Sequence, residues 1–91
     1  MFIHIGDNVA IPLKGIVGVF DLEGTTITGN TRDFLKIAEE EGFVKTVSGK
    51  MPRSFIVTEQ NRQSVVYVTP ISVSTIKKRI NFWFKNKNKE L

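Results

Sequence analysis

The chain has 91 residues, no cysteine, a single histidine (His4) and a formal net charge of +4. A chain of this length forms one domain that buries only about 60–65% of its unfolded surface, so its own core is small. The composition excludes a disulfide framework, a thiolate nucleophile and the usual multi-histidine metal sets. No apolar run approaches the roughly 20 residues of a membrane span, so we expect no membrane segment and a cytoplasmic protein.

The charge is divided unevenly along the chain. Residues 1–41 carry three basic and seven acidic side chains, a balance of −4, whereas residues 42–91 carry ten basic and two acidic ones, a balance of +8. A basic half of this kind indicates a polyanion partner for the C-terminal part of the chain. The alternative is that these charges serve solubility alone.

Short apolar runs at residues 2–5 and 9–11 predict two strands with a turn between them. Residues 15–22 are the most apolar run of the first half and predict a strand buried on both faces. Gly18 inside this run indicates a bulge or the close approach of another backbone. We expect two or three strands of this N-terminal third to form a meander.

A helix is predicted in the middle of the chain. Residues 23–29 read as a loop, after which Asn30 or Thr31 caps the helix. Gly42 follows as a left-handed terminator. The apolar stripe of this helix consists of Phe34, Ile37 and Ala38.

A β-hairpin is predicted next. Residues 43–47 are expected to form a short strand or an extended piece, and a loop over residues 48–52 leads into the hairpin. The two hairpin strands, at residues 54–58 and 64–69, are rich in β-branched and aromatic residues. The polar segment between them contains Asn61, which tolerates the positive φ of a turn.

The C-terminal part predicts a second helix. Pro70 ends the preceding strand because it lacks an N–H for the ladder, and Ser72 then caps the helix. Its apolar face consists of Val73, Ile76, Ile80 and Phe84. We therefore predict one α+β domain over residues 1–84, with a small antiparallel sheet (N-terminal strands plus C-terminal hairpin), one central and one C-terminal helix. Residues 85–91 are expected to be a basic, flexible tail.

Residues that support catalysis are not evident. His4 alternates with apolar residues in a strand, which favours a hydrogen-bonded structural histidine over a catalytic one. Asp21 and Glu23 are close in sequence, but no convergent third group accompanies them. We expect no enzyme activity, no catalytic residue, no metal, no cofactor and no small-molecule substrate.

The basic residues at element ends favour a polyanion site instead. Lys14 stands at a strand-to-strand break, and Lys50 and Arg53 flank Pro52 where a loop enters the hairpin. Cations in such places suit phosphate contact, although they are often simply solvated. A second cluster, on the C-terminal helix, consists of Lys77, Lys78 and Arg79.

An aromatic triplet, Phe82-Trp83-Phe84, follows the second basic cluster. It can be interpreted as a stacking platform for bases. We favour packing on the sheet or against another copy of the chain, because the triplet continues the apolar face of the helix. We therefore predict that it belongs to an oligomer interface.

Four short motifs together resemble the RemA/RemB group of small bacterial regulators, with the RemB (YaaB-like) branch the closer match. They are IHIGDN at residues 3–8, KGIVGVFD at 14–21, PRSFIVT at 52–58 and YVTPISVSTIKKR at 67–79. The resemblance implies a DNA-binding regulator of extracellular-matrix (biofilm) genes that assembles into a ring-like homo-oligomer. It also implies that the basic positions of the family fall on Lys14, Lys50 and Arg53.

Two positions depart from that family. Met51 stands where RemA-like members carry a second arginine, and Lys14 stands where arginine, which can contact phosphate bidentately, is usual. Our first hypothesis is an oligomeric regulator that binds double-stranded DNA through its phosphate backbone. A protein-interaction scaffold without DNA contact is the alternative, and RNA in place of DNA stays open.

Overall fold

The computed structural model of the chain describes residues 1–22 and 29–89. Its strands are β1 (Phe2–Gly6), β2 (Val9–Pro12), β3 (Ile16–Asp21), β4 (Val44–Thr46), β5 (Ser54–Gln60) and β6 (Gln63–Thr69). Its helices are α1 (Gly29–Glu40) and α2 (Val73–Lys89), and a short 3-10 turn, η1 (Leu13–Gly15), joins β2 to β3.

The strands form two sheets. β1 and β2 pair only with each other, whereas the second sheet has the order β3-β5-β6-β4. In the larger sheet β5 is antiparallel to both neighbours, and β4 runs parallel to β6. The predicted α+β class is confirmed. The prediction of a single antiparallel sheet is wrong. Of the two or three N-terminal strands expected in a meander, β1 and β2 pair with each other, whereas β3 leaves them to pair with the C-terminal hairpin.

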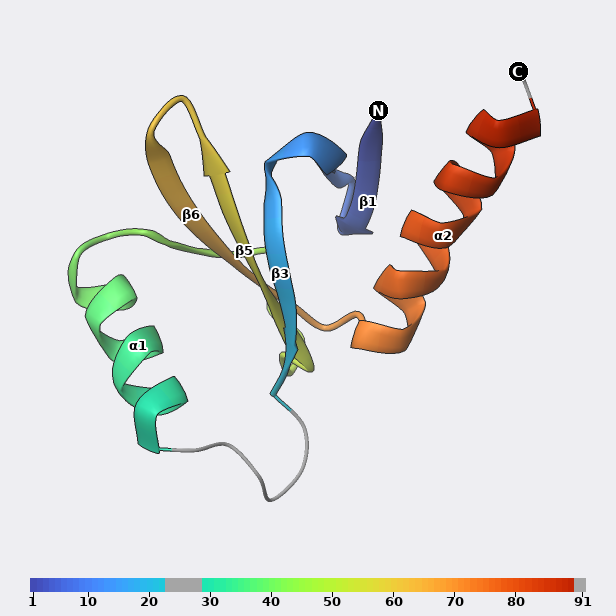
Figure 1. Cartoon of the computed structure of the whole chain (residues 1–91). Helices are drawn as coiled ribbons and strands as arrows, with labels where there is room; N and C mark the ends of the chain where they lie inside the picture. Colours follow the sequence, from blue (N-terminus) through green and yellow to red (C-terminus); the bar gives the residue numbers. More distant parts are fainter. Residues whose placement is uncertain (23–28, 90–91) are drawn as a thin grey trace.

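The larger sheet lies between two covering layers. α1 lies on one side of it, and the β1–β2 hairpin and α2 lie on the other (Figure 1). Consecutive residues of β5 face these two sides: Phe55 packs towards α1, and Ile56 packs towards β1. Both are almost fully buried, with exposures of 2% and 0%.

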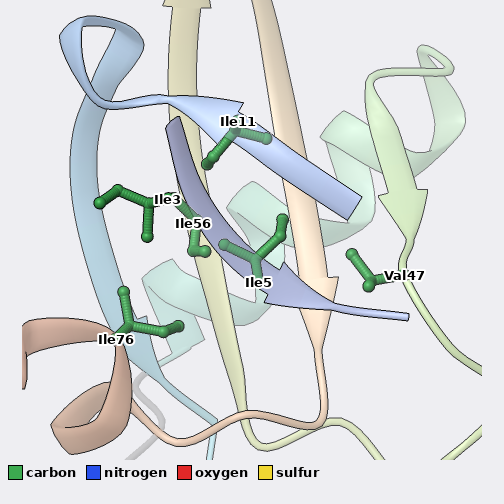
Figure 2. Close-up of a cluster of buried hydrophobic side chains, with 6 residues drawn as sticks. All are labelled: Ile3, Ile5, Ile11, Val47, Ile56 and Ile76. Carbon is green, nitrogen blue, oxygen red and sulfur yellow. The ribbon is translucent and has the colours of Figure 1, made fainter. Parts of the chain in front are cut away.

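The chain has two clusters of buried apolar residues, and the larger one lies between the small hairpin, the larger sheet and α2. We call it the larger core, and it explains why β1 and β2 form their own sheet. Ile3, Ile5 and Ile11 point from the small hairpin onto the larger sheet, where they meet Ile56 and Ile76 (Figure 2). Extending the larger sheet with these strands would leave the face of β5 that carries Ile56 uncovered. Burial of apolar surface thus favours stacking the hairpin on the sheet.

Thr69 fixes the small hairpin to the end of β6. Its buried hydroxyl donates to the carbonyl oxygen of Ile5 and accepts a hydrogen bond from the N–H of Ile71. Ser54, also fully buried, donates to the carbonyl oxygen of Ile71 at 2.6 Å. These bonds set the direction in which the chain leaves the sheet towards α2.

Two-residue turns close both hairpins. Asn61 and Arg62 have φ of 51° and 65°, and Asp7 and Asn8 have φ of 45° and 62°. Positive φ at both central residues matches the twist of paired strands. The predicted turn at Asn61 is confirmed, but the strands beside it reach further than predicted, since the ladder includes the pair Gln60–Gln63.

α1 begins earlier than the sequence predicts and ends as predicted. Because the helix begins at Gly29, Asn30 and Thr31 lie inside its first turn and do not cap it. The predicted loop at 23–29 falls, up to residue 28, outside the described residues. At the other end Gly42 has a φ of 79°, and its neighbour Phe43 donates its N–H to the carbonyl oxygen of Ala38 at 2.8 Å. The left-handed terminator is therefore confirmed.

β3 is one of the two edge strands of the larger sheet, and the prediction that it is buried on both faces is wrong. Val17 is 65% exposed and Phe20 is 47% exposed. α1 packs over β4, β5 and β6 and leaves β3 partly uncovered. The predicted bulge is confirmed, because the register with β5 shifts between Ile16 and Gly18.

α2 begins as predicted and continues further. The N–H of Thr75 donates to the Ser72 hydroxyl at 3.3 Å, which confirms the cap. The helix runs to Lys89, into the segment for which we predict a frayed tail. The domain boundary at residue 84 stays a prediction. Trp83 rather than Phe84 packs against the core, because Trp83 lies two turns from the buried Ile76.

Candidate nucleic-acid interface

Lys14 lies beside the turn that joins β5 to β6. It is exposed in η1 and lines a polar hollow of about 200 Å³ together with Glu59 and Asn61. η1 packs closely on this turn, because a Cβ at Gly15 would come within 2.8 Å of the exposed Gln60 side chain. The close packing of Gly15 on Gln60 thus holds η1, and with it Lys14, at the tip of the hairpin.

Lys50 and Arg53 lie at the opposite end of β5. Two backbone hydrogen bonds hold the backbone of Arg53. Its N–H donates to the carbonyl oxygen of Thr69, and its carbonyl oxygen accepts from the N–H of Leu22, each at 2.9 Å. Lys50 is exposed in the loop before it. Since β5 has seven residues, Lys14 and Arg53 are separated by roughly 20 Å along the strand.

The structure therefore separates the three basic residues that the resemblance implies into two groups, with Lys14 at one end of β5 and Lys50 and Arg53 at the other. Within one subunit Lys14 does not meet Lys50 or Arg53. A single phosphate cannot be held by both groups of one chain, so they would contact different parts of a nucleic acid. Sequence reasoning missed this separation because Lys14 is placed by the packing of η1 against Gln60, which is distant in sequence.

The three cations of α2 differ from one another. Lys77 and Lys78 are exposed, whereas Arg79 is half-buried. Arg79 donates from Nη1 to the backbone carbonyl oxygen of His4 at 2.8 Å, and this nitrogen lies 3.4 Å from Nδ1 of the His4 ring. His4 thus takes part in a structural contact, as predicted. Arg79 holds α2 to β1, whatever else it binds.

The aromatic triplet does not form one surface. Phe82 is 69% exposed and Phe84 is 50% exposed, on different sides of α2, because successive helical residues are about 100° apart. Trp83 between them packs against the core. Its ring meets the ring of Phe84 edge-on, with 4.9 Å between the ring centroids. The favoured interpretation, packing on the sheet, is confirmed for Trp83. A contact of Phe82 and Phe84 with another copy stays a prediction.

An apolar groove between β1 and α2 is a feature that sequence reasoning missed. It has a volume of about 710 Å³ and is lined by Met1, Phe2, Phe82 and Trp83, with Lys78 and Arg79 among its polar residues. We call it the β1–α2 groove. The available signal was the alternation of β1, which buries Ile3 and Ile5 and turns Phe2 outward.

The described residues offer little for other chemistry. Within residues 1–22 and 29–86 no three metal-ligating side chains gather into a candidate site. None of the helices in the described part of the chain combines the length and apolar character needed to cross a bilayer.

The chain is a small α+β domain with exposed basic residues, and it belongs to the RemA-like family. The family model, described as extracellular matrix regulatory protein A-like, matches residues 2–80. Among curated proteins the chain is similar to extracellular matrix regulatory protein B of Bacillus subtilis (strain 168). The two are 38% identical over 85 residues, which cover 93% of this chain and 96% of that protein. The resemblance read from the four motifs is confirmed, and both comparisons name regulators and no enzyme.

Proposed function

We propose that the protein is an oligomeric, DNA-binding transcriptional regulator of extracellular-matrix genes. Membership of the RemA-like family and the name of the Bacillus subtilis relative support the regulatory role. The observation that carries DNA binding is the placement of four exposed lysines: Lys14, Lys50, Lys77 and Lys78. The structure shows no ion pair between any of them and the residues that it describes. They are therefore available for phosphate groups.

Assembly into a ring-like homo-oligomer raises the affinity that these lysines give for DNA. One subunit offers few phosphate contacts, and those at the two ends of β5 lie roughly 20 Å apart. Repeating them around a closed assembly raises the affinity through effective concentration without any new contact. The exposed apolar surface supports assembly, since Phe2, Val17 and Phe82 are each more than 60% exposed.

The binding mode that fits this arrangement is contact with the phosphate backbone. The cations lie in loops and on the outside of α2, and neither α1 nor α2 as far as residue 86 presents the Asn, Gln and Arg spacing that reads base edges. Backbone contact releases counterions, so affinity falls steeply as salt rises. We expect a loss of at least tenfold between 50 and 200 mM salt.

A gel-shift assay with charge-reversed variants tests the proposal. Lys14→Glu and Lys50→Glu should each weaken binding of a random duplex at least tenfold and leave the native mass unchanged. Lys36→Glu is the matched control, because it makes the same charge change at an exposed position of α1. Equal losses in all three variants would show that net charge alone matters and would contradict the assigned sites.

A scaffold that binds only protein is the second candidate. The exposed apolar surfaces and the engagement of Arg79 by His4 favour it. It predicts a stable assembly that shifts no duplex at any salt concentration. A single-stranded RNA competitor in the same assay distinguishes RNA from DNA, because a DNA-specific protein keeps its duplex when RNA is in excess.

A further inference from the structure

The closed end of the β5–β6 hairpin is a polar surface that takes no part in the core. Residues 59–64, with the sequence Glu-Gln-Asn-Arg-Gln-Ser, are all exposed. The buried part of β5 ends one residue earlier, at Thr58, which is 6% exposed. Figure 1 shows the closed end of the hairpin extending beyond α1. We call residues 59–64 the hairpin tip. Since the tip buries no apolar side chain, the core does not account for its length or its composition.

The hairpin tip is rigid although it is exposed. The ladder of backbone hydrogen bonds continues to its last pair, Gln60 and Gln63. Asn61 and Arg62 between them both have positive φ, the geometry that closes a two-residue hairpin turn. Gly15 of η1 packs closely on Gln60 and supports the tip from one side. Side chains carried on such a turn lose little backbone freedom when they bind, which favours affinity.

The dimensions of the tip match those of the major groove of DNA. Paired strands lie about 4.8 Å apart, and the major groove, about 12 Å wide, admits a two-stranded ribbon. From Thr58 to Asn61 the chain advances three residues, or roughly 10 Å at about 3.3 Å per residue. The major groove is about 8.5 Å deep, so the tip can reach the base edges. The minor groove, about 6 Å wide, is too narrow for the ribbon.

The side chains of the tip are of the types that distinguish base pairs. In the major groove Asn and Gln pair with adenine through N6 and N7, and Arg pairs with guanine through O6 and N7. Four consecutive residues of the tip belong to these types: Gln60, Asn61, Arg62 and Gln63. Asn61 and Arg62 form the turn itself and lie furthest from the sheet. Within the described part of the chain, neither of these two side chains is engaged in a hydrogen bond or an ion pair.

Lys14 lies beside the tip, where a phosphate group would be. It lines the polar hollow with Glu59 and Asn61. A ribbon in the major groove has a phosphate backbone along each side, so a cation beside the ribbon contacts phosphate while the turn contacts bases. Glu59 lies two residues before the turn, and a carboxylate there can accept a hydrogen bond from cytosine N4. The tip and Lys14 thus offer the two kinds of contact that a sequence-specific protein combines.

We propose that the hairpin tip enters the major groove of duplex DNA and that Asn61 and Arg62 contact base edges there. Phosphate contacts position a protein on DNA but do not distinguish sequences, so these two residues give the regulator its preference for particular sites. The inference rests on the DNA binding of the proposed function and adds sequence readout to it. An RNA duplex does not fit this tip, because its major groove is too deep and narrow for side chains to read.

A binding-site selection on the full chain tests the proposal. The wild-type protein selects from a pool of randomised duplexes, and gel shifts then measure its affinity for the selected duplex and for a scrambled duplex of the same composition. Arg62→Lys keeps the charge but removes the planar fork, and Asn61→Gly removes the amide but suits the φ of 51°. Each should weaken binding of the selected duplex roughly fivefold or more and change binding of the scrambled duplex by less than about twofold.

Two control variants separate base contacts from other effects. Arg32→Lys makes the same change at an exposed position of α1 and should leave both affinities unchanged. Lys14→Gln should weaken binding of both duplexes by the same factor, because a phosphate contact is independent of sequence. Urea unfolding should show that all four variants are folded, since each replaced residue is exposed.

Modified bases identify the groove. A 7-deazapurine lacks the N7 acceptor of the major groove and leaves the minor-groove edge unchanged. When the purines of the selected duplex are replaced one at a time, wild-type binding should weaken roughly fivefold or more at one or two positions. Arg62→Lys or Asn61→Gly should abolish the effect at the position that the replaced residue contacts, because the two changes then remove the same interaction.

Contrary results separate this inference from the proposed function. The inference is overturned if the wild type binds the pool but enriches no sequence. It is equally overturned if Arg62→Lys and Asn61→Gly weaken both duplexes alike or not at all, or if no 7-deazapurine weakens binding. In each of these cases the proposed function stands with phosphate contacts alone. If the wild type binds no duplex even at low salt, the proposed function fails and the inference fails with it.

Discussion

Arg79 donates a hydrogen bond from Nη1 to the backbone carbonyl oxygen of His4, at a distance of 2.8 Å. The bond joins α2 to β1 through two residues that are 75 positions apart in sequence. Both residues line the β1–α2 groove. Arg79, which the sequence predicts to contact DNA, thus contributes to the stability of the fold.

Replacing Arg79 should therefore lower stability. Arg79→Gln removes a charge-assisted donor from β1, and we expect the free energy of unfolding to fall by about 1 kcal/mol. Lys78→Gln, one residue earlier and exposed, should change it by less than about 0.5 kcal/mol. Urea unfolding of both variants decides the matter, and equal stabilities would contradict a structural role for Arg79.

Thr69 should be more sensitive than other threonines of the sheet. Thr69→Val keeps the side-chain shape but leaves the Ile5 carbonyl oxygen and the Ile71 N–H without their partner. The expected cost is about 1–3 kcal/mol of unfolding free energy. Thr46→Val is the control, because Thr46 is exposed on β4. A Thr69→Val variant as stable as the wild type would show that these bonds contribute nothing.

Two exposed glycines offer a matched test of backbone conformation. A Cβ at Gly42 or at Gly49 meets no atom within 4 Å, but only Gly42 has a positive φ, of 79°. Gly42→Ala should therefore cost about 1–2 kcal/mol through the left-handed conformation. Gly49→Ala should be neutral or slightly stabilising. Thermal unfolding of the pair would contradict this account if the two variants had the same midpoint.

Ile76 joins α2 to the larger core and is 0% exposed. Ile76→Ala should lower the free energy of unfolding by about 2–5 kcal/mol, because it leaves a cavity between the sheet and the helix. Met51→Ala is the exposed control and should cost less than about 0.5 kcal/mol. A small effect at Ile76 in urea unfolding would mean that α2 is not packed as described.

Local sequence signals predicted the elements well. The turn at Asn61, the cap at Ser72 and the terminator at Gly42 each follow from one or two residues and their own backbone. The β-branched and aromatic residues of β5 and β6, with the polar segment between them, predicted the hairpin. Such features depend on neighbours in sequence, so they can be read without knowing the rest of the fold.

Features that depend on distant contacts were not predicted. The sequence of β3 predicts a buried strand, but β3 is partly exposed, because α1 packs over β4, β5 and β6 and leaves β3 partly uncovered. β4 pairs in parallel with β6, a connection that no short motif specifies. The candidate site shows the same limit: the basic residues were identified one by one, but the distance between Lys14 and Arg53 and the partner of Arg79 depend on packing.

The native mass of the purified protein, measured by light scattering with and without duplex DNA, tests the central claim most directly. The account predicts an assembly of several subunits that gains the mass of the duplex at 50 mM salt and loses most of it by 200 mM. A single 91-residue chain that ignores DNA even at low salt would contradict it.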